Sequence, residues 1–158
     1  MTYPIHAHID GPLVMIGFGS IGRGTLPLIE RHIGHDRSAF TVIEPSADFA
    51  HILQDHGITH LQLALTPDNF EQTLRGLFPA GKGMVVNLSV DVDSILLMEL
   101  CAKLGVQYID TVVEPWPGFY FGSTLPNADR TNYPFRERVR ALGRNHVGGP
   151  NAVTCSGA

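Results

Sequence analysis

A glycine pattern near the start of the chain limits its possible folds more than any other feature. The apolar residues 13–16 lead into Gly17, Gly19 and Gly22, which have the spacing GxGxxG, and a sequence typical of a helix follows. A strand, a glycine turn and a helix in this order form the phosphate-binding unit of dinucleotide-binding α/β folds. The pattern is weak by itself, so the rest of the chain has to supply the other parts of such a fold.

Each glycine has a physical role in this hypothesis. Gly17 permits the tight turn after the strand, Gly19 leaves room for a pyrophosphate beside the backbone, and Gly22 allows the helix to pack closely on the strand. The first helical turn, with Ser20 and Ile21, presents free backbone N–H groups to the phosphates. We therefore predict that these five residues bind the pyrophosphate of a dinucleotide.

The remaining sequence alternates between strand and helix signals. Apolar runs predict strands at residues 13–17, 40–43, 61–65, 84–89, 106–113 and 152–156. Helices are predicted between them, at residues 20–33, 46–56 (with Ser46 as its N-cap), 66–78, 92–104 and 133–145. Residues 1–12 are expected to form a short arm. The sequence thus predicts one domain over residues 1–158, an α/β fold of Rossmann type with a doubly wound, mainly parallel six-stranded sheet and helices on both faces.

Glu44 follows the second predicted strand and lies 22 positions after Gly22. Dinucleotide-binding folds place an acidic residue near this distance, where its carboxylate accepts hydrogen bonds from the adenosine ribose hydroxyls. Because the same charge repels the 2′-phosphate of NADP, Glu44 favours NAD as the cofactor. In the alternative interpretation, Glu44 only precedes Pro45 in a solvated turn.

Polar residues follow the fourth and fifth predicted strands. In doubly wound sheets, ligands bind at the carboxyl ends of the strands. Asn87 and Ser89 can therefore reach the cofactor phosphate or the nicotinamide-side ribose, and Thr111 is assigned to the same site. Alternatively, Asn87 and Ser89 cap the helix that follows them.

Composition and charge argue against several classes of protein. A net charge of −4 gives no reason to expect nucleic acid or an anionic membrane as partner. No apolar run approaches the roughly 18 residues that span a bilayer, and the first residues do not have the pattern of a signal peptide. Cys101 and Cys155 lack metal-binding spacing and are expected to be reduced, buried thiols in a cytoplasmic protein. The histidines, including His6 and His8, are scattered, so no metal site is predicted.

Three segments resemble the amino-terminal part of bacterial homospermidine synthase. The first is the glycine segment 14–28, and the second is Asn-Leu-Ser-Val-Asp at 87–91. The third, at 108–121, contains Asp-Thr-Val-Val-Glu-Pro-Trp and is far more specific than the glycine pattern. The resemblance extends over nearly the whole chain. It implies a saccharopine-dehydrogenase-like architecture, with an NAD-binding Rossmann domain and a larger second domain.

The resemblance also implies a reaction. Two putrescine molecules condense to homospermidine and release ammonia, and NAD is a hydride carrier that is regenerated within the cycle. Homospermidine synthases are much longer than this chain, whose last residues, Ser-Gly-Ala, would continue into Asn-Pro-Gly in that family. We therefore expect the amino-terminal part of an enzyme that is homodimeric when complete, and we expect this part to be inactive alone.

Glu114, Asp91 and Trp116 are the candidates for contact with a cationic diamine. Glu114 and Asp91 are predicted at the ends of neighbouring strands, where carboxylates can bind ammonium groups and move protons. Their alternative roles are a solvated turn before a proline for Glu114 and the N-cap of the next helix for Asp91. Trp116 can offer its ring face to an alkylammonium group or anchor a hydrophobic lid. The aromatic residues 119–121 are expected to pack.

Two other functions are compatible with the sequence. One is a different NAD-dependent amine or amino-acid dehydrogenase of the saccharopine type. The other is a free-standing, non-catalytic NAD-binding module that senses redox state. A truncated enzyme is expected to expose apolar surface, whereas a free-standing module is not. A methyltransferase fits less well, because the glycine turn has the dinucleotide spacing.

Overall fold

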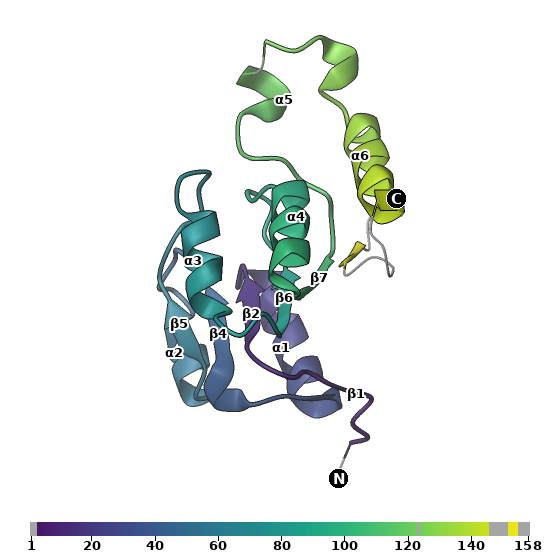
Figure 1. Cartoon of the computed structure of the whole chain (residues 1–158). Coiled ribbons are helices and arrows are strands. Elements are labelled where there is room, and N and C mark those ends of the chain that lie inside the picture. Colours follow the sequence, from purple (N-terminus) through teal and green to yellow (C-terminus); the bar gives the residue numbers. More distant parts are fainter. Residues whose placement is uncertain (1–2, 123, 146–151, 155–158) are drawn as a thin grey trace.

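The computed structural model describes residues 3–122, 124–145 and 152–154 (Figure 1). Within these residues, one sheet has six strands in the order β5-β4-β2-β6-β7-β8, and all neighbouring strands are parallel. Numbered along the chain within this sheet, the order is 3-2-1-4-5-6, that of a Rossmann fold. The predicted fold class is confirmed.

The elements follow the predicted alternation of strands and helices. The strands of this sheet are β2 (Leu13–Ile16), β4 (Phe40–Ile43), β5 (Thr59–Leu61), β6 (Met84–Asn87), β7 (Gln107–Asp110) and β8 (Ala152–Thr154). The helices are α1 (Ser20–His32), α2 (Ala50–Asp55), α3 (Phe70–Leu77), α4 (Ser94–Leu104), α5 (Phe119–Gly122) and α6 (Asn132–Asn145), with short 3-10 turns at Arg37–Ala39 and Asn127–Asp129. Within the described residues, no helix is both long enough and apolar enough to cross a membrane.

Alternate side chains of the strands enter two hydrophobic layers, one on each face of the sheet. In the first layer, residues such as Val14, Val85 and Tyr108 pack with apolar side chains of α3, α4 and α6. In the second layer, residues such as Met15 and Val42 pack with α1 and α2. We call these the α3-α4-α6 layer and the α1-α2 layer. Burial on both faces explains why these strands are apolar throughout.

The N-cap of α4 differs from the expectation. The carboxylate of Asp93 accepts a hydrogen bond from the N–H of Leu96 at 2.9 Å, so Asp93 caps the helix. The alternative roles of Asn87, Ser89 and Asp91 as caps of this helix are therefore wrong.

Local turns account for the other differences in the first half of the chain. The hydroxyl of Ser46 accepts a hydrogen bond from the N–H of Asp48, which forms a turn, and α2 begins only at Ala50. The amide oxygen of Asn69 accepts a hydrogen bond from the N–H of Thr66, three residues earlier, and α3 begins only at Phe70. The third strand is at 59–61 instead of 61–65, because these residues pair with β4.

The amino-terminal arm is more ordered than predicted. Strand β1 (Ala7–His8) pairs in parallel with β3 (Ile33–Gly34), directly after α1, and forms a second small sheet. The ring of His6 stacks on the ring of His32, with 5.3 Å between centroids. Cys101 is a buried free thiol, as predicted. Cys155 and the predicted end of the last strand lie outside the described residues.

Candidate functional site

A cleft of about 400 Å³ opens at the carboxyl ends of β2, β4 and β6. Its lining comes from the turn after β2, from residues 43–45 and 63–65, and from the loop 88–92 after β6. The order of the strands reverses between β2 and β6, and this is the place where ligands bind in doubly wound sheets. Leu63 and Leu65, whose spacing suggested a strand, belong to this lining instead.

The three glycines of the turn face different surroundings. Gly17 has a φ of 89°, and a Cβ on it would lie 3.0 Å from the backbone nitrogen of Ser89. A Cβ on Gly22 would lie 2.7 Å from the carbonyl oxygen of Gly17. At Gly19, apart from the residue itself and its neighbours in the chain, no described residue lies within 4 Å of such a Cβ. Gly17 and Gly22 therefore permit close backbone packing, and Gly19 leaves open space at the start of α1.

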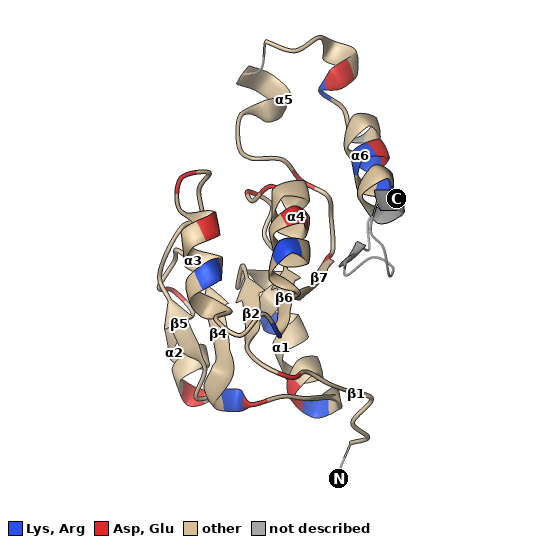
Figure 2. Ribbon diagram, in the orientation of Figure 1, with Lys and Arg blue, Asp and Glu red and all other residues tan. Residues whose placement is uncertain are grey.

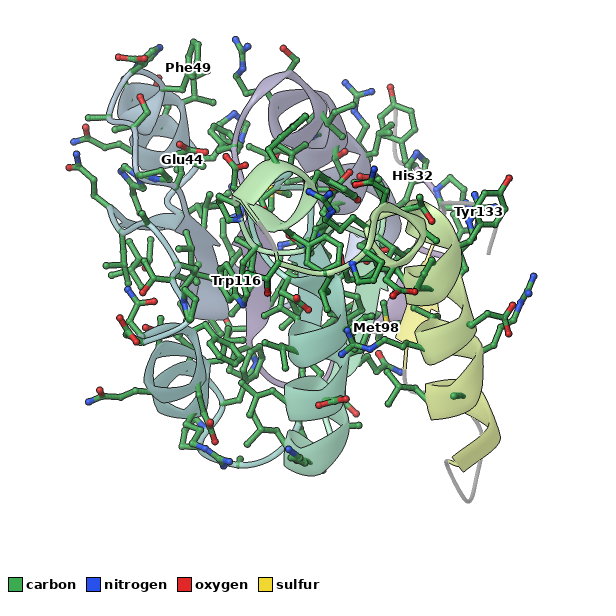
Figure 3. The ribbon with its side chains drawn as sticks, turned by 90° about the horizontal axis from the view of Figure 1, so that it is seen from above. His32, Glu44, Phe49, Met98, Trp116 and Tyr133 are labelled. Atoms are coloured by element: carbon green, nitrogen blue, oxygen red, sulfur yellow. The ribbon has the colours of Figure 1, made fainter. Side chains whose placement is uncertain are left out.

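Glu44 bonds to the glycine turn. One carboxylate oxygen accepts a hydrogen bond from the N–H of Phe18 at 2.7 Å, and the other accepts one from the N–H of Ser46 at 3.0 Å. A carboxylate offers about four acceptor positions, so about two remain for other donors. The side chain is partly buried in the cleft lining, in the same region of Figure 3 as Phe49. Glu44 is thus held by hydrogen bonds within the cleft lining. The alternative interpretation placed it in a solvated turn.

A buried polar network supports the loop after β6. The amide nitrogen of Asn87 donates to the hydroxyl of Tyr108 at 3.1 Å, and this hydroxyl donates to Asp110 at 2.9 Å. The amide oxygen of Asn87 accepts the N–H and the O–H of Ser89 at 3.2 and 2.8 Å. Burial and the nearby charge of Asp110 raise the pKa of Tyr108 well above its ordinary value, so the hydroxyl stays protonated. Ser89 is the member of this network that lines the cleft.

Asp91 and Glu114 are close enough to interact electrostatically. Burial raises the pKa of Glu114, and the charge of Asp91 raises it further, while a 3.4 Å hydrogen bond from the hydroxyl of Tyr120 lowers it. Reciprocal bonds join the backbone of Glu114 to Ser94 at the start of α4. Asp91 lines the cleft, and Glu114 lies outside its lining. Figure 2 shows acidic residues in the loops above α4, on the side to which the strands' carboxyl ends point.

Trp116 packs on the α3-α4-α6 layer. Its ring meets Phe70 edge to face, with 5.7 Å between centroids, which fits the lid-anchor interpretation. Its indole N–H is buried and has no hydrogen-bond partner among the described residues. Phe119 packs on Phe135 as expected, but Phe121 is 94% exposed, so the expectation that it packs is wrong.

Thr111 is exposed after β7 and does not belong to the cleft lining. Tyr108, Asp110 and Tyr120 support the site although their roles were not predicted from the sequence. The sequence contains a sign that Tyr108 and Asp110 act together, because residues 108 and 110 share one face of a strand. In the part of the chain that the structure describes, no group of three or more His, Cys, Asp or Glu side chains can hold a metal ion.

Comparison with known proteins identifies the family. Residues 13–153 match the family described as the saccharopine dehydrogenase NADP binding domain. The chain belongs to this family. It is 52% identical over 158 residues to homospermidine synthase from Blastochloris viridis and 51% identical over 159 residues to homospermidine synthase from Mesorhizobium japonicum. Each match covers 99% of this chain and 33% of the relative, so the chain spans about a third of the length of these curated relatives.

A solved structure shares the fold of this saccharopine dehydrogenase NADP binding domain. The crystal structure of homospermidine synthase from Legionella pneumophila in complex with NAD matches it with a TM-score of 0.77. The match covers 94% of this chain and 29% of that one, at 24% sequence identity. The Rossmann arrangement of the family member described here is therefore also present in a much longer protein.

Proposed function

We propose that the chain is the NAD-binding, amino-terminal portion of a homospermidine synthase. The observation that carries this proposal is the cleft at the reversal of strand order, where Glu44 bonds to the glycine turn. The 52% identity to a homospermidine synthase across 99% of the chain supports the choice of enzyme. The complete enzyme is proposed to be a homodimer that condenses two putrescines to homospermidine and ammonia.

The cleft residues fit a dinucleotide. The backbone N–H groups at Gly19, Ser20 and Ile21 bind the pyrophosphate at the start of α1. Glu44 accepts hydrogen bonds from the adenosine ribose, and the apolar residues 63–65 pack against the adenine. Ser89, held by Asn87, contacts the ribose beside the nicotinamide. When bound, NAD supplies the carrier that accepts and returns a hydride.

Glu44 favours NAD over NADP in this proposal, although the family description names NADP. Both of its oxygens already accept a backbone N–H, which holds the carboxylate in the cleft lining beside the glycine turn. A 2′-phosphate here would meet a carboxylate at close range, in a partly buried setting where like charges repel strongly. The Legionella homologue, which has the same fold, is in complex with NAD.

Asp91, Glu114 and Trp116 form the substrate side of the proposed site. The two carboxylates attract the ammonium groups of a diamine. Burial raises the pKa of Glu114, which favours a role for this carboxyl in proton transfer. Trp116 packs edge to face on Phe70, and its buried indole N–H has no partner among the described residues. Thr111 is kept as a cofactor contact in the complete enzyme.

Calorimetric titration of the chain with NAD and NADP tests the cofactor assignment. We expect NAD to bind at least tenfold more tightly than NADP. The variant Glu44→Gln, which removes the charge but keeps one acceptor, should reduce this ratio several-fold. Asp48→Asn, at an exposed position outside the cleft lining, is the matched control and should leave the ratio unchanged. Equal binding of both cofactors by the unaltered chain would contradict the role of Glu44.

A saccharopine-type dehydrogenase is the second candidate, because the family description names that enzyme. A chimera in which this chain replaces the matching third of the B. viridis enzyme separates the two functions. We expect the chimera to form homospermidine from putrescine with NAD and to leave amino-acid substrates unoxidised. Oxidation of an amino acid without homospermidine formation would favour the second candidate.

A further inference from the structure

A second cavity of about 400 Å³ lies on the α1-α2 face of the sheet, apart from the cofactor cleft. Its floor consists of Met84 and Val86 of β6 and Ile109 of β7. Thr25 and Ile29 of α1 form one wall, and the segment that contains β1 forms the other. We call this cavity the α1-β6-β7 groove. Its described lining is mostly apolar and contains no Asp, Glu, Lys or Arg side chain, while His8, Thr25 and Gln107 are its polar members, so it favours a largely apolar occupant.

Among the described residues, the groove marks a part of the sheet that is covered less completely on one face than on the other. Parallel sheets occur almost exclusively with both faces covered. Tyr108 of β7 points into the α3-α4-α6 layer and is 2% exposed. Of its two neighbours in the strand, Gln107 is exposed and Ile109 is half-buried. On the face of Ile109, the described helices α1 and α2 pack with β2, β4 and Val86 of β6, whereas Met84 and Ile109 are only partly buried.

The apolar surface continues from the groove onto α1. Leu28 is 55% exposed. It lies three residues after Thr25 of the groove wall, so the two share one side of the helix. Large apolar side chains exposed next to an apolar groove are typical of a surface that another element covers.

We propose that the α1-β6-β7 groove and the adjacent side of α1 bind a helix from the remaining part of a longer protein. The matched region is 33% of each homospermidine synthase relative, so most of such a protein lies outside it and is available as a cover. A helix is the element that covers a parallel sheet in α/β folds. Its apolar face fills the groove and contacts Leu28. Binding of this helix is supported by the length of the relatives and does not require the proposed cofactor or reaction.

Thiol labelling tests the proposal in this chain and in the chimera with the B. viridis enzyme. Leu28→Cys is combined with Cys155→Ser, and the rate of its reaction with a maleimide is measured by peptide mass spectrometry. We expect fast labelling in the isolated chain and labelling at least tenfold slower in the chimera. Gln72→Cys, at an exposed position on α3, is the matched control and should react at the same rate in both proteins.

Each outcome decides the question. Protection of Leu28→Cys in the chimera alone supports a covering helix from the same chain. Equal rates in both proteins overturn the proposal. Protection in the isolated chain that grows with concentration, with a doubled mass by light scattering, also overturns it and assigns the surface to a second copy. The same replacement in the M. japonicum enzyme is the second background, so one chimera that fails to fold does not remove the test.

Discussion

The two faces of the sheet differ in how completely they are covered. Over β7, the α3-α4-α6 layer buries Tyr108, while the next residue, Ile109, lies half-buried over the α1-β6-β7 groove. Both faces have apolar side chains, although the described helices complete only one of them. The difference teaches that an apolar strand sequence does not by itself reveal how completely the described helices cover each face of the sheet.

The thiol of Cys101 gives the largest expected difference between the two faces. Burial on α4 raises the pKa of this thiol to about 12, so its thiolate at pH 8 is about a thousandfold rarer than that of an exposed cysteine. In the Cys155→Ser background, native Cys101 should react with a disulfide reagent at least a thousandfold more slowly than Leu28→Cys. Stopped-flow absorbance measures both rates. Similar rates would show that the α3-α4-α6 layer opens readily.

Truncations to alanine compare the packing of the two faces directly. Leu97 on α4 is fully buried, so Leu97→Ala should lower the free energy of unfolding by about 2–5 kcal/mol. Ile109→Ala should cost less than about 1.5 kcal/mol, because this side chain is half-exposed in the isolated chain. Urea unfolding followed by circular dichroism measures both values. Equal costs would contradict the difference in cover.

The polar network on the covered face should have an intermediate effect. Tyr108→Phe removes the acceptor of the Asn87 amide and the donor to Asp110, at a cost of about 1–3 kcal/mol. Tyr133→Phe, at an exposed position of α6, is the matched control and should change little. The same unfolding measurement applies. A neutral Tyr108→Phe would mean that water replaces the lost hydroxyl.

The smallest effect is expected at the surface of α3, outside both layers. Arg75 pairs with Glu71 at 2.7 Å, one helical turn away, and both side chains are about half exposed. Arg75→Ala should therefore cost only about 0.3–0.5 kcal/mol. Repeating the measurement in 1 M sodium chloride, at which screening is strong, should remove most of this cost. A cost that persists in salt would point to packing of the arginine stem instead.

The periodicity of the sequence predicted the sheet and the glycine turn, because these depend on local patterns. The run 13–17, the glycine spacing and Glu44 were sufficient to place the cleft. Side chains that bond to nearby backbone were harder to place. Asp91 and Asp93 are equally suited by residue type to cap a helix. Asp93 is the cap because α4 begins directly after it in the folded chain.

Contacts between distant segments also escaped prediction. The pairing of residues 7–8 with 33–34 joins two stretches without a strand pattern of their own. The bond between Glu44 and the N–H of Phe18 links positions 26 residues apart, and nothing in their spacing indicates it. Phe121 was expected to pack because of its type, but α5 is a single short turn and leaves its ring in solvent.

The double attachment of Glu44 has a consequence for evolution and for engineering. The residue that is proposed to select the cofactor also fastens the backbone of the turn that holds the phosphates. A mutation of Glu44 to a residue without a side-chain acceptor, made to admit a 2′-phosphate, therefore also frees the N–H of Phe18. Conversion to NADP by such a mutation then needs a second change that holds the turn.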